Sequence, residues 1–146
     1  MKDGDITTDL LSSNAVTFRD GITKKSQQTV GRTYVNILVL TLPVGERPVK
    51  GDKLLVQGAV AVVNERQGDY RVVIDATGGA TPNTVILNGN FGHARGGDTV
   101  NFSRTVDVIA ELPYVIRHVY IQARRTGDNS LTLGVGTFLD VMRIKR

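Results

Sequence analysis

The sequence predicts an all-β fold, an antiparallel jelly-roll-like β-sandwich of about eight strands with an extended N-terminal arm. Three observations support this fold class. Short runs rich in Val, Ile, Thr and aromatic residues recur from residue 32 onward, and Gly, Asp, Asn or Pro separates nearly all of them. Two of these runs alternate between apolar and polar residues with the period of a strand. No stretch beyond residue 15 keeps a helical period, so strands should form the domain.

The expected strands each follow a turn signal, such as the Gly-Asp pairs at 51–52 and 68–69. They are Tyr34–Leu42, Lys53–Val63, Tyr70–Asp75, Thr84–Asn88, Thr99–Ala110, Tyr114–Arg124, Ser130–Val135 and Thr137–Ile144. Gly58, inside the second strand, should mark a bulge or a point of close packing. A chain of 146 residues is long enough for one hydrophobic core. We expect an arm over residues 1–31 and a sandwich domain over residues 32–146.

Three of the expected strands are apolar on both faces, namely residues 34–42, 54–63 and 114–123. In contrast, the strand that holds Tyr70, Val72 and Ile74 is apolar mainly on one face, as is the strand that holds Phe102. An antiparallel sandwich buries one face of each sheet, so a strand with two apolar faces needs a second cover. That cover is the N-terminal arm, a loop or another subunit. The third choice makes the protein an oligomer.

Residues 1–31 are polar and contain only scattered apolar side chains, so this segment cannot bury a core alone. It is either a loose terminus or an arm that becomes ordered on a neighbouring subunit. A short strand is expected over Ala15–Arg19. If the segment is an arm, its anchors are the apolar residues Leu10, Leu11, Val16, Phe18 and Ile22.

The composition excludes several kinds of site. With 0 Cys, the chain has no disulfides and no thiolate metal ligands. Its two histidines, His93 and His118, lack the spacing of a zinc site, so we expect no metal and no cofactor. No apolar run approaches the roughly 18 residues that cross a bilayer, and no leader segment is seen, so no membrane partner is expected.

Catalysis has no positive evidence in the sequence. Ser103, Asp107 and His118 could be combined as a triad, but Ser103 lies within a strand and no GxSxG elbow occurs. Most carboxylates stand beside turns, where turn formation explains them. We therefore expect that the protein is not an enzyme and has no catalytic residues.

The net charge of +4 is mildly basic, and basic residues gather late in the chain at Arg117, Arg124, Arg125, Arg143, Lys145 and Arg146. Binding of nucleic acid needs a concentrated basic stripe with stacking aromatics, whereas this chain has only 4 Phe, 4 Tyr and no Trp. Nucleic acid is therefore not an expected partner. A basic edge that faces an acidic protein lattice fits at least as well.

The last segment, GDNSLTLGVGTFLDVMRIKR, resembles the closing strands of trimeric jelly rolls related to tumour-necrosis-factor and C1q heads. Many virion proteins of tailed bacteriophages share this pattern. The last strand of that pattern has the form T-x-L-x-V-x-R-I, which is matched by Thr137, Leu139, Val141, Arg143 and Ile144. The resemblance covers residues 32–146 as a pattern and leaves the arm outside.

The resemblance implies a homotrimer in which the outer strand faces pack around a threefold axis. His118, Tyr120 and Gln122 share one face of their strand, a polar-aromatic stripe of the kind that lines interfaces. We predict that the trimer interface comprises Tyr34, Asn36, Leu38, Tyr114, Ile116, His118, Tyr120, Leu139 and Val141.

Two viral roles follow from the resemblance. The first is a capsid decoration or cement protein, made in the host cytoplasm and located on the capsid surface of the virion, where its partner is the major capsid protein lattice. The second is the head of a tail fibre or spike that binds a host receptor, for example a glycan. A short arm that leads directly into the domain favours decoration, because a fibre head usually follows a long shaft. A non-viral oligomeric binding module is a third alternative.

Overall fold

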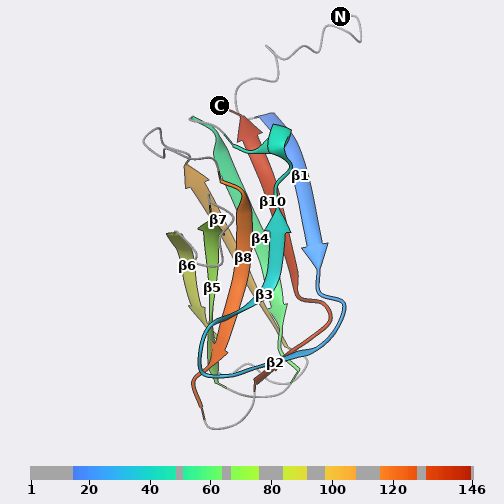
Figure 1. Cartoon of the computed structure of the whole chain (residues 1–146), viewed down its shortest axis with the longest axis vertical. Coiled ribbons are helices and arrows are strands. Elements are labelled where there is room, and N and C mark those ends of the chain that lie inside the picture. Colours follow the sequence, from blue (N-terminus) through green and yellow to red (C-terminus); the bar gives the residue numbers. More distant parts are fainter. Residues whose placement is uncertain are drawn as a thin grey trace, which may run out of the picture.

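The computed structural model describes residues 15–48, 51–63, 67–75, 84–91, 98–107, 116–127 and 131–145. In this part of the chain nearly every element is a strand (Figure 1). The elements are β1 (Ala15–Thr23), β2 (Gln28–Val30), β3 (Val35–Thr41), the short 3-10 turn η2 (Val44–Glu46), β4 (Lys53–Ala61), β5 (Gly68–Asp75), β6 (Thr84–Asn90), β7 (Thr99–Asp107), β8 (His118–Arg125), β9 (Leu131–Leu133) and β10 (Phe138–Lys145).

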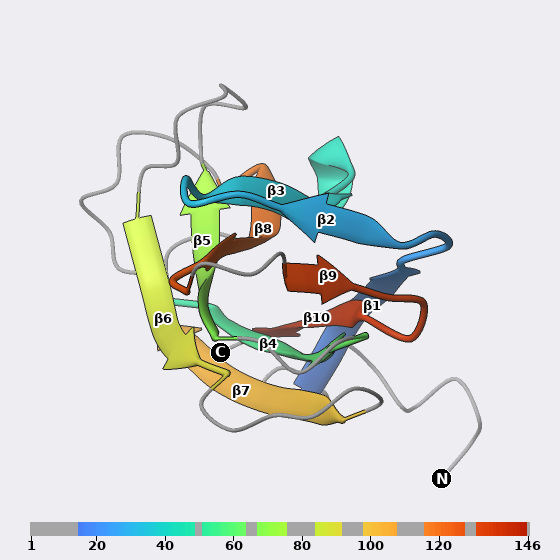
Figure 2. The same cartoon turned by 90° about the horizontal axis from the view of Figure 1, so that it is seen from below.

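The strands form two four-stranded antiparallel sheets that pack face to face. One has the order β1-β10-β4-β7 and the other the order β3-β8-β5-β6. A short ribbon, β2-β9, lies at the lower end of the sandwich in Figure 1, and Figure 2 shows the two layers from that end. After β3 the chain crosses repeatedly between the two sheets, which is the connectivity of a jelly roll. The predicted all-β, jelly-roll fold is confirmed.

All eight strands expected from the sequence are found, with small differences at their ends. The strand expected to begin at Tyr114 is β8, which begins at His118. Tyr114 itself lies outside the described residues, as does the end of the strand expected over Thr99–Ala110, which is β7 up to Asp107.

Residues 15–30, which the sequence assigns to a separate arm, are paired within the sandwich. β1 pairs with β10 at the edge of its sheet, and β2 pairs with β9. The physical reason is that this segment supplies apolar side chains to the core: Val30 is buried, and Phe18 and Ile22 pack against the core cluster. Three of the predicted arm anchors are not seen, because Leu10 and Leu11 lie outside the described residues and the side chain of Val16 is not described.

The core fills the space between the two sheets with aliphatic side chains, and an aromatic group lies near β5 and β7. The Tyr70 ring lies 5.4 Å from the Phe91 ring and 5.9 Å from the Phe102 ring, which are favourable separations for tilted aromatic pairs. The same core cluster contains fully buried aliphatic side chains from both sheets, among them Leu54, Val56, Val60, Val72, Val119, Ile121, Leu139 and Val141.

One buried cation is held near β2. Lys24 is 9% exposed, and its Nζ donates to Gln28 Oε1 at 2.7 Å and to the Ile37 carbonyl oxygen at 3.3 Å. Burial lowers the pKa of Lys24, since desolvation disfavours the charged amine. The two acceptors meet the requirement that a buried donor be hydrogen-bonded.

A β-bulge explains why residues 34–42 look apolar on both faces. The register of β3 against β8 shifts between Asn36 and Leu38. As a result, the consecutive residues Ile37 and Leu38 are both buried in the core cluster, which strict alternation forbids. Past the bulge, Val39 pairs with Tyr120 on the outer side of the sheet.

Gly58 marks close packing and not a bulge, because β4 keeps a regular register with both of its neighbours. A Cβ at this position would collide with the Phe138 carbonyl oxygen and would lie 2.8 Å from Phe102 Cζ. The absence of a side chain therefore lets the Phe102 ring and the β10 backbone approach β4.

Replacing Gly58 by alanine is expected to lower the free energy of unfolding by about 1–3 kcal/mol, because the β10 backbone has to move to admit the methyl group. Chemical denaturation measures this loss. Gly31→Ala is the matched control, since a Cβ there meets nothing within 4 Å. An equal loss in both variants would contradict the packing explanation.

Candidate functional site

The outer face of the β3-β8-β5-β6 sheet carries polar side chains that contact one another across the strands, and we call it the polar face. Its members follow from the strand register, in which Asn36 is opposite Gln122, Gln122 is opposite Arg71, and Arg71 is opposite Asn88. These four side chains form one row across the sheet. A second row, toward the start of β3, contains Arg124, Asp69 and Asn90, with Tyr34 at its end.

The second row is held by a charged chain of contacts. Arg124 Nη2 lies 3.2 Å from Asp69 Oδ2, and Asn90 Nδ2 donates to Asp69 Oδ1 at 2.9 Å. The Arg124 guanidinium also lies over the Tyr34 ring, 4.5 Å from its centroid. The Asp69 carboxylate, itself held by Asn90, and the Tyr34 ring thus fix the position of the Arg124 guanidinium.

The first row is an amide-guanidinium chain. Gln122 Nε2 donates to Asn36 Oδ1 at 2.8 Å, and Arg71 Nε donates to Gln122 Oε1 at 2.7 Å. Arg71 reaches across to the second row, where its guanidinium carbon lies 4.0 Å from the centroid of the same Tyr34 ring. Tyr34 therefore contacts two guanidinium groups, and we call Tyr34, Arg71 and Arg124 the Tyr34 clamp.

Farther along the sheet the polar face becomes apolar. Val39, Tyr120, Val73 and Val85 are aligned across the four strands, and Tyr120 and Val73 are buried there although they do not belong to the core cluster. At the end of this region Thr41 Oγ1 lies 3.0 Å from His118 Nδ1, and the His118 and Tyr120 rings are 5.9 Å apart.

The structure divides the nine residues predicted for a trimer interface. Tyr34, Asn36, His118 and Tyr120 lie on the polar face, with Tyr34 near one end of the sheet and His118 near the other. The other described members are buried within the chain, because Leu38, Ile116, Leu139 and Val141 belong to the core cluster. Tyr114 lies outside the described residues. Sequence reasoning missed the contributions of β5, Asp69 and Arg71, because only the pairing of β5 with β8 places them beside the stripe.

The outer face of the β1-β10-β4-β7 sheet has a different character, and we call it the apolar face. Phe138 is 38% exposed there, and its neighbours Leu55, Met142 and Ile144 are partly exposed. The register sets Met142 opposite Leu55 and Phe138 opposite the buried Ala59. These side chains form a patch that the single chain leaves partly in water.

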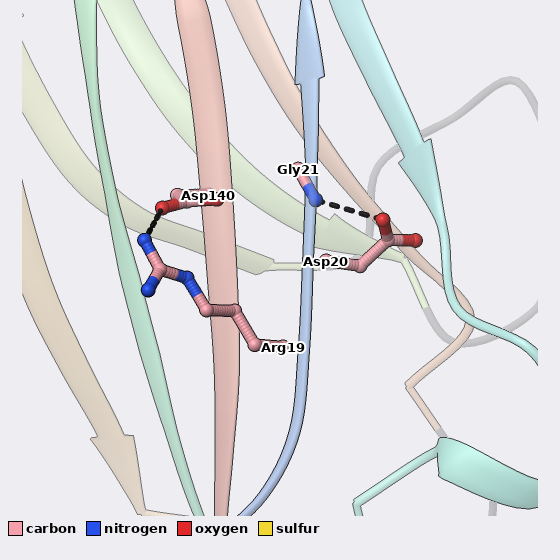
Figure 3. Close-up of polar contacts among 4 residues, drawn as sticks. All are labelled: Arg19, Asp20, Gly21 and Asp140. Atoms are coloured by element: carbon pink, nitrogen blue, oxygen red, sulfur yellow. Dashed lines mark hydrogen bonds and ion pairs between the residues drawn. The ribbon is translucent and has the colours of Figure 1, made fainter.

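Charges on the apolar face are paired across strands. Arg19 Nη2 lies 3.0 Å from Asp140 Oδ2, between β1 and β10 (Figure 3). Asp140 can lie against β1 because Gly21 has no Cβ, which would collide with the Asp140 carboxylate. On the other side of the patch the register sets Lys53 opposite Asp107. In the part of this face that the structure describes, two cations and two anions therefore stand around the apolar residues.

The three residues considered as a triad are not assembled. Ser103 and Asp107 lie on β7 in one sheet, and His118 lies on β8 in the other. Among the described residues, no group of three or more His, Cys, Asp or Glu could hold a metal ion. In the same residues no helix has the length and apolarity to cross a membrane.

No known protein family and no curated protein matches the sequence. Solved structures match the fold. VP2 of infectious bursal disease virus, in a subviral particle, has a TM-score of 0.58 at 10% identity, over 88% of this chain and 33% of VP2. A cyclase from Fischerella sp. TAU has a TM-score of 0.53 at 17% identity, over 78% of this chain and 59% of the cyclase.

The xylan-binding module CBM15 has a TM-score of 0.51 at 8% identity, over 86% of this chain and 97% of the module. At these identities the likeness is one of fold. The chain thus shares a jelly-roll sandwich with a viral particle protein, of which it spans 33% of the length, with an enzyme and with a carbohydrate-binding module.

Proposed function

We propose that this chain is a virion structural protein, a decoration protein that forms a trimer and binds the major capsid protein lattice, and that its role is binding and not catalysis. The apolar face carries this proposal. Phe138, Leu55 and Met142 are partly exposed on neighbouring strands of one sheet, where an isolated domain would more usually place polar residues. Contact with other copies would remove this surface from water, at about 25 cal/mol per Å² of apolar area.

The charges around the patch suit contact between identical copies. Arg19 and Asp140 neutralise each other, and Lys53 stands opposite Asp107. Among the described residues of this face, these two cations and two anions leave no excess of one sign to repel an identical surface. The proposed trimer therefore uses the apolar face, which leaves the polar face and its four sequence-predicted residues for another partner.

Attachment to a lattice would follow from multivalency. Three copies would present three equal surfaces to a repeating shell, so weak single contacts would combine into strong occupancy through effective concentration. The likeness to VP2 of a viral particle is compatible with this role, since it shows that the fold occurs in such assemblies.

The oligomer is tested by light scattering of the full chain after size exclusion. We expect a mass of three chains of 15.8 kDa each. Met142→Lys places a charge in the patch and should shift the mass to that of one chain, whereas Asn88→Lys, at an exposed position of β6 on the other sheet, should leave the trimer intact. A wild-type monomer would refute the trimer. Electron microscopy of particles from the native source then distinguishes density on the capsid from density on the tail.

The second candidate function is the head domain of a tail fibre or spike that binds a host receptor. The observation that favours it is the polar face, where two arginines, a tyrosine and several amides are held in fixed positions. Tail density in the same micrographs would select this candidate.

A further inference from the structure

We infer that the polar face binds an acidic saccharide, with the carboxylate or sulfate group of the sugar held by Arg71 and Arg124. The Tyr34 clamp is the basis of this inference. Both guanidinium carbons lie over one aromatic ring, at 4.0 and 4.5 Å from its centroid. A cation-π contact uses the flat face of a guanidinium, so the N–H groups at its edge are left for hydrogen bonds.

The clamp is positioned before any ligand arrives. Gln122 fixes Arg71 through a 2.7 Å hydrogen bond, and Asp69 fixes Arg124 through a 3.2 Å ion pair. Since the side chains are already ordered, a ligand loses little affinity to the cost of immobilising them. This is the geometry of a preformed site and not of two mobile surface arginines.

Donors remain after these contacts are made. A guanidinium has five N–H groups, and the hydrogen bonds described here use one nitrogen of Arg71 and one of Arg124. Two cations against the single carboxylate of Asp69 leave a charge of 2 − 1 = +1 on the clamp and its partner. The site therefore favours an anion.

Amide side chains beside the clamp indicate what else the ligand carries. Asn36 and Asn88 are exposed at opposite ends of the row that contains Gln122 and Arg71. Each amide offers both donors and acceptors, which is the combination that sugar hydroxyl groups require. An anionic group surrounded by hydroxyls is the chemistry of a uronate, a sialylated glycan or a sulfated sugar.

An acidic protein segment fits the same place less well. Cores of protein interfaces are poor in charge and rich in aromatic and apolar side chains. None of the large apolar residues that the structure exposes in its described part lies in the two polar rows, where the only aromatic ring, Tyr34, already contacts two cations. These rows present hydrogen-bonding groups instead of an apolar contact surface.

The test is a glycan array with uronate, sialylated and sulfated glycans beside neutral ones, followed by calorimetry on the full chain. Oligogalacturonate is compared with its methyl ester, and sialyllactose with lactose. We expect at least one acidic probe to bind at least tenfold more tightly than its neutral parent. Arg71→Met should weaken that binding at least tenfold, whereas Arg104→Met, an exposed arginine of β7 on the other sheet, should not change it.

Asn88→Ala separates a saccharide site from a simple anion site. Asn88 is exposed, so its replacement keeps the fold and should weaken the acidic glycan at least threefold without changing binding of inorganic sulfate. No binding, equal binding of acidic and neutral probes, or equally tight binding of sulfate or a polyglutamate peptide would overturn the inference. The trimer is tested by molecular mass and the saccharide site by binding affinity, so one proposal can be refuted while the other stands.

Discussion

Replacing Asp52 by alanine is expected to lower the free energy of unfolding by about 3–5 kcal/mol, because the largely buried Arg143 then loses its 2.8 Å carboxylate contact. The Asp52 side chain is 4% exposed and accepts a 2.8 Å hydrogen bond from Arg143 Nε. Arg143 is only 15% exposed and stands on β10 opposite the fully buried Leu54. Glu46 lies 4.0 Å from Arg143 Nη1, too far to replace the lost carboxylate contact.

Urea denaturation measures this loss, and the chain offers a matched control. Arg19 and Asp140 form an ion pair of similar length, but the Arg19 side chain is 62% exposed. Arg19→Gln should cost about 0–1 kcal/mol, because water screens an exposed pair. The double variant Asp52→Ala with Arg143→Met should recover part of the loss, since no charge is then left buried. Equal losses of unfolding free energy for Asp52→Ala and Arg19→Gln would show that burial does not determine how much an ion pair contributes to stability.

The strands could be predicted because their signals are local. Each expected strand is a run of β-branched or aromatic residues, and turn residues mark most boundaries. Lys53–Val63 and Thr137–Ile144, for example, appear as β4 (Lys53–Ala61) and β10 (Phe138–Lys145). β2 was not predicted, because three residues that pair with the equally short β9 carry too little pattern to be recognised.

Bulges limited what could be predicted about the faces. Strict alternation makes Ile37 and Leu38 point to opposite sides of the sheet, and so gives β3 a second apolar face. The bulge between Asn36 and Leu38 places both residues in the core. On β8 two of the outer side chains, Tyr120 and Gln122, are each only 5% exposed. The apolar surplus inferred from β3 and β8 is thus absorbed within the chain, whereas that of β4 remains partly exposed at Leu55, beside Met142 of β10.

The polar face shows the same division between local and long-range information. The stripe of His118, Tyr120 and Gln122 could be read from one strand. The Tyr34 clamp could not, since Tyr34 and Arg71 come from segments whose contact depends on the order β3-β8-β5. Alternation predicts the face of the sheet on which a side chain lies. Its neighbour on the adjacent strand can be identified only when the register between the two strands is known.

Removal of residues 1–31 is expected to abolish cooperative folding, whereas removal of residues 1–14 should leave it intact. The longer deletion removes β1 and β2, exposes the edge of β10, and takes Phe18, Ile22 and Val30 from the core. Losses of this kind compare with the whole stability of a domain, about 5–15 kcal/mol. The shorter deletion ends before Ala15, the first residue of β1, and so keeps every described strand. Circular dichroism with thermal denaturation measures both variants.

This pair of truncations also separates a structural role of the N-terminal segment from a role in attachment. If residues 1–14 bind the capsid lattice, the shorter variant should keep the trimer mass and occupy fewer sites on particles, because each copy loses one of its contacts. Unchanged occupancy would restrict lattice binding to the sandwich itself. Cooperative unfolding of the longer variant would mean that β1 is dispensable, which contradicts its eight register pairs with β10 and the burial of the side chains that it supplies.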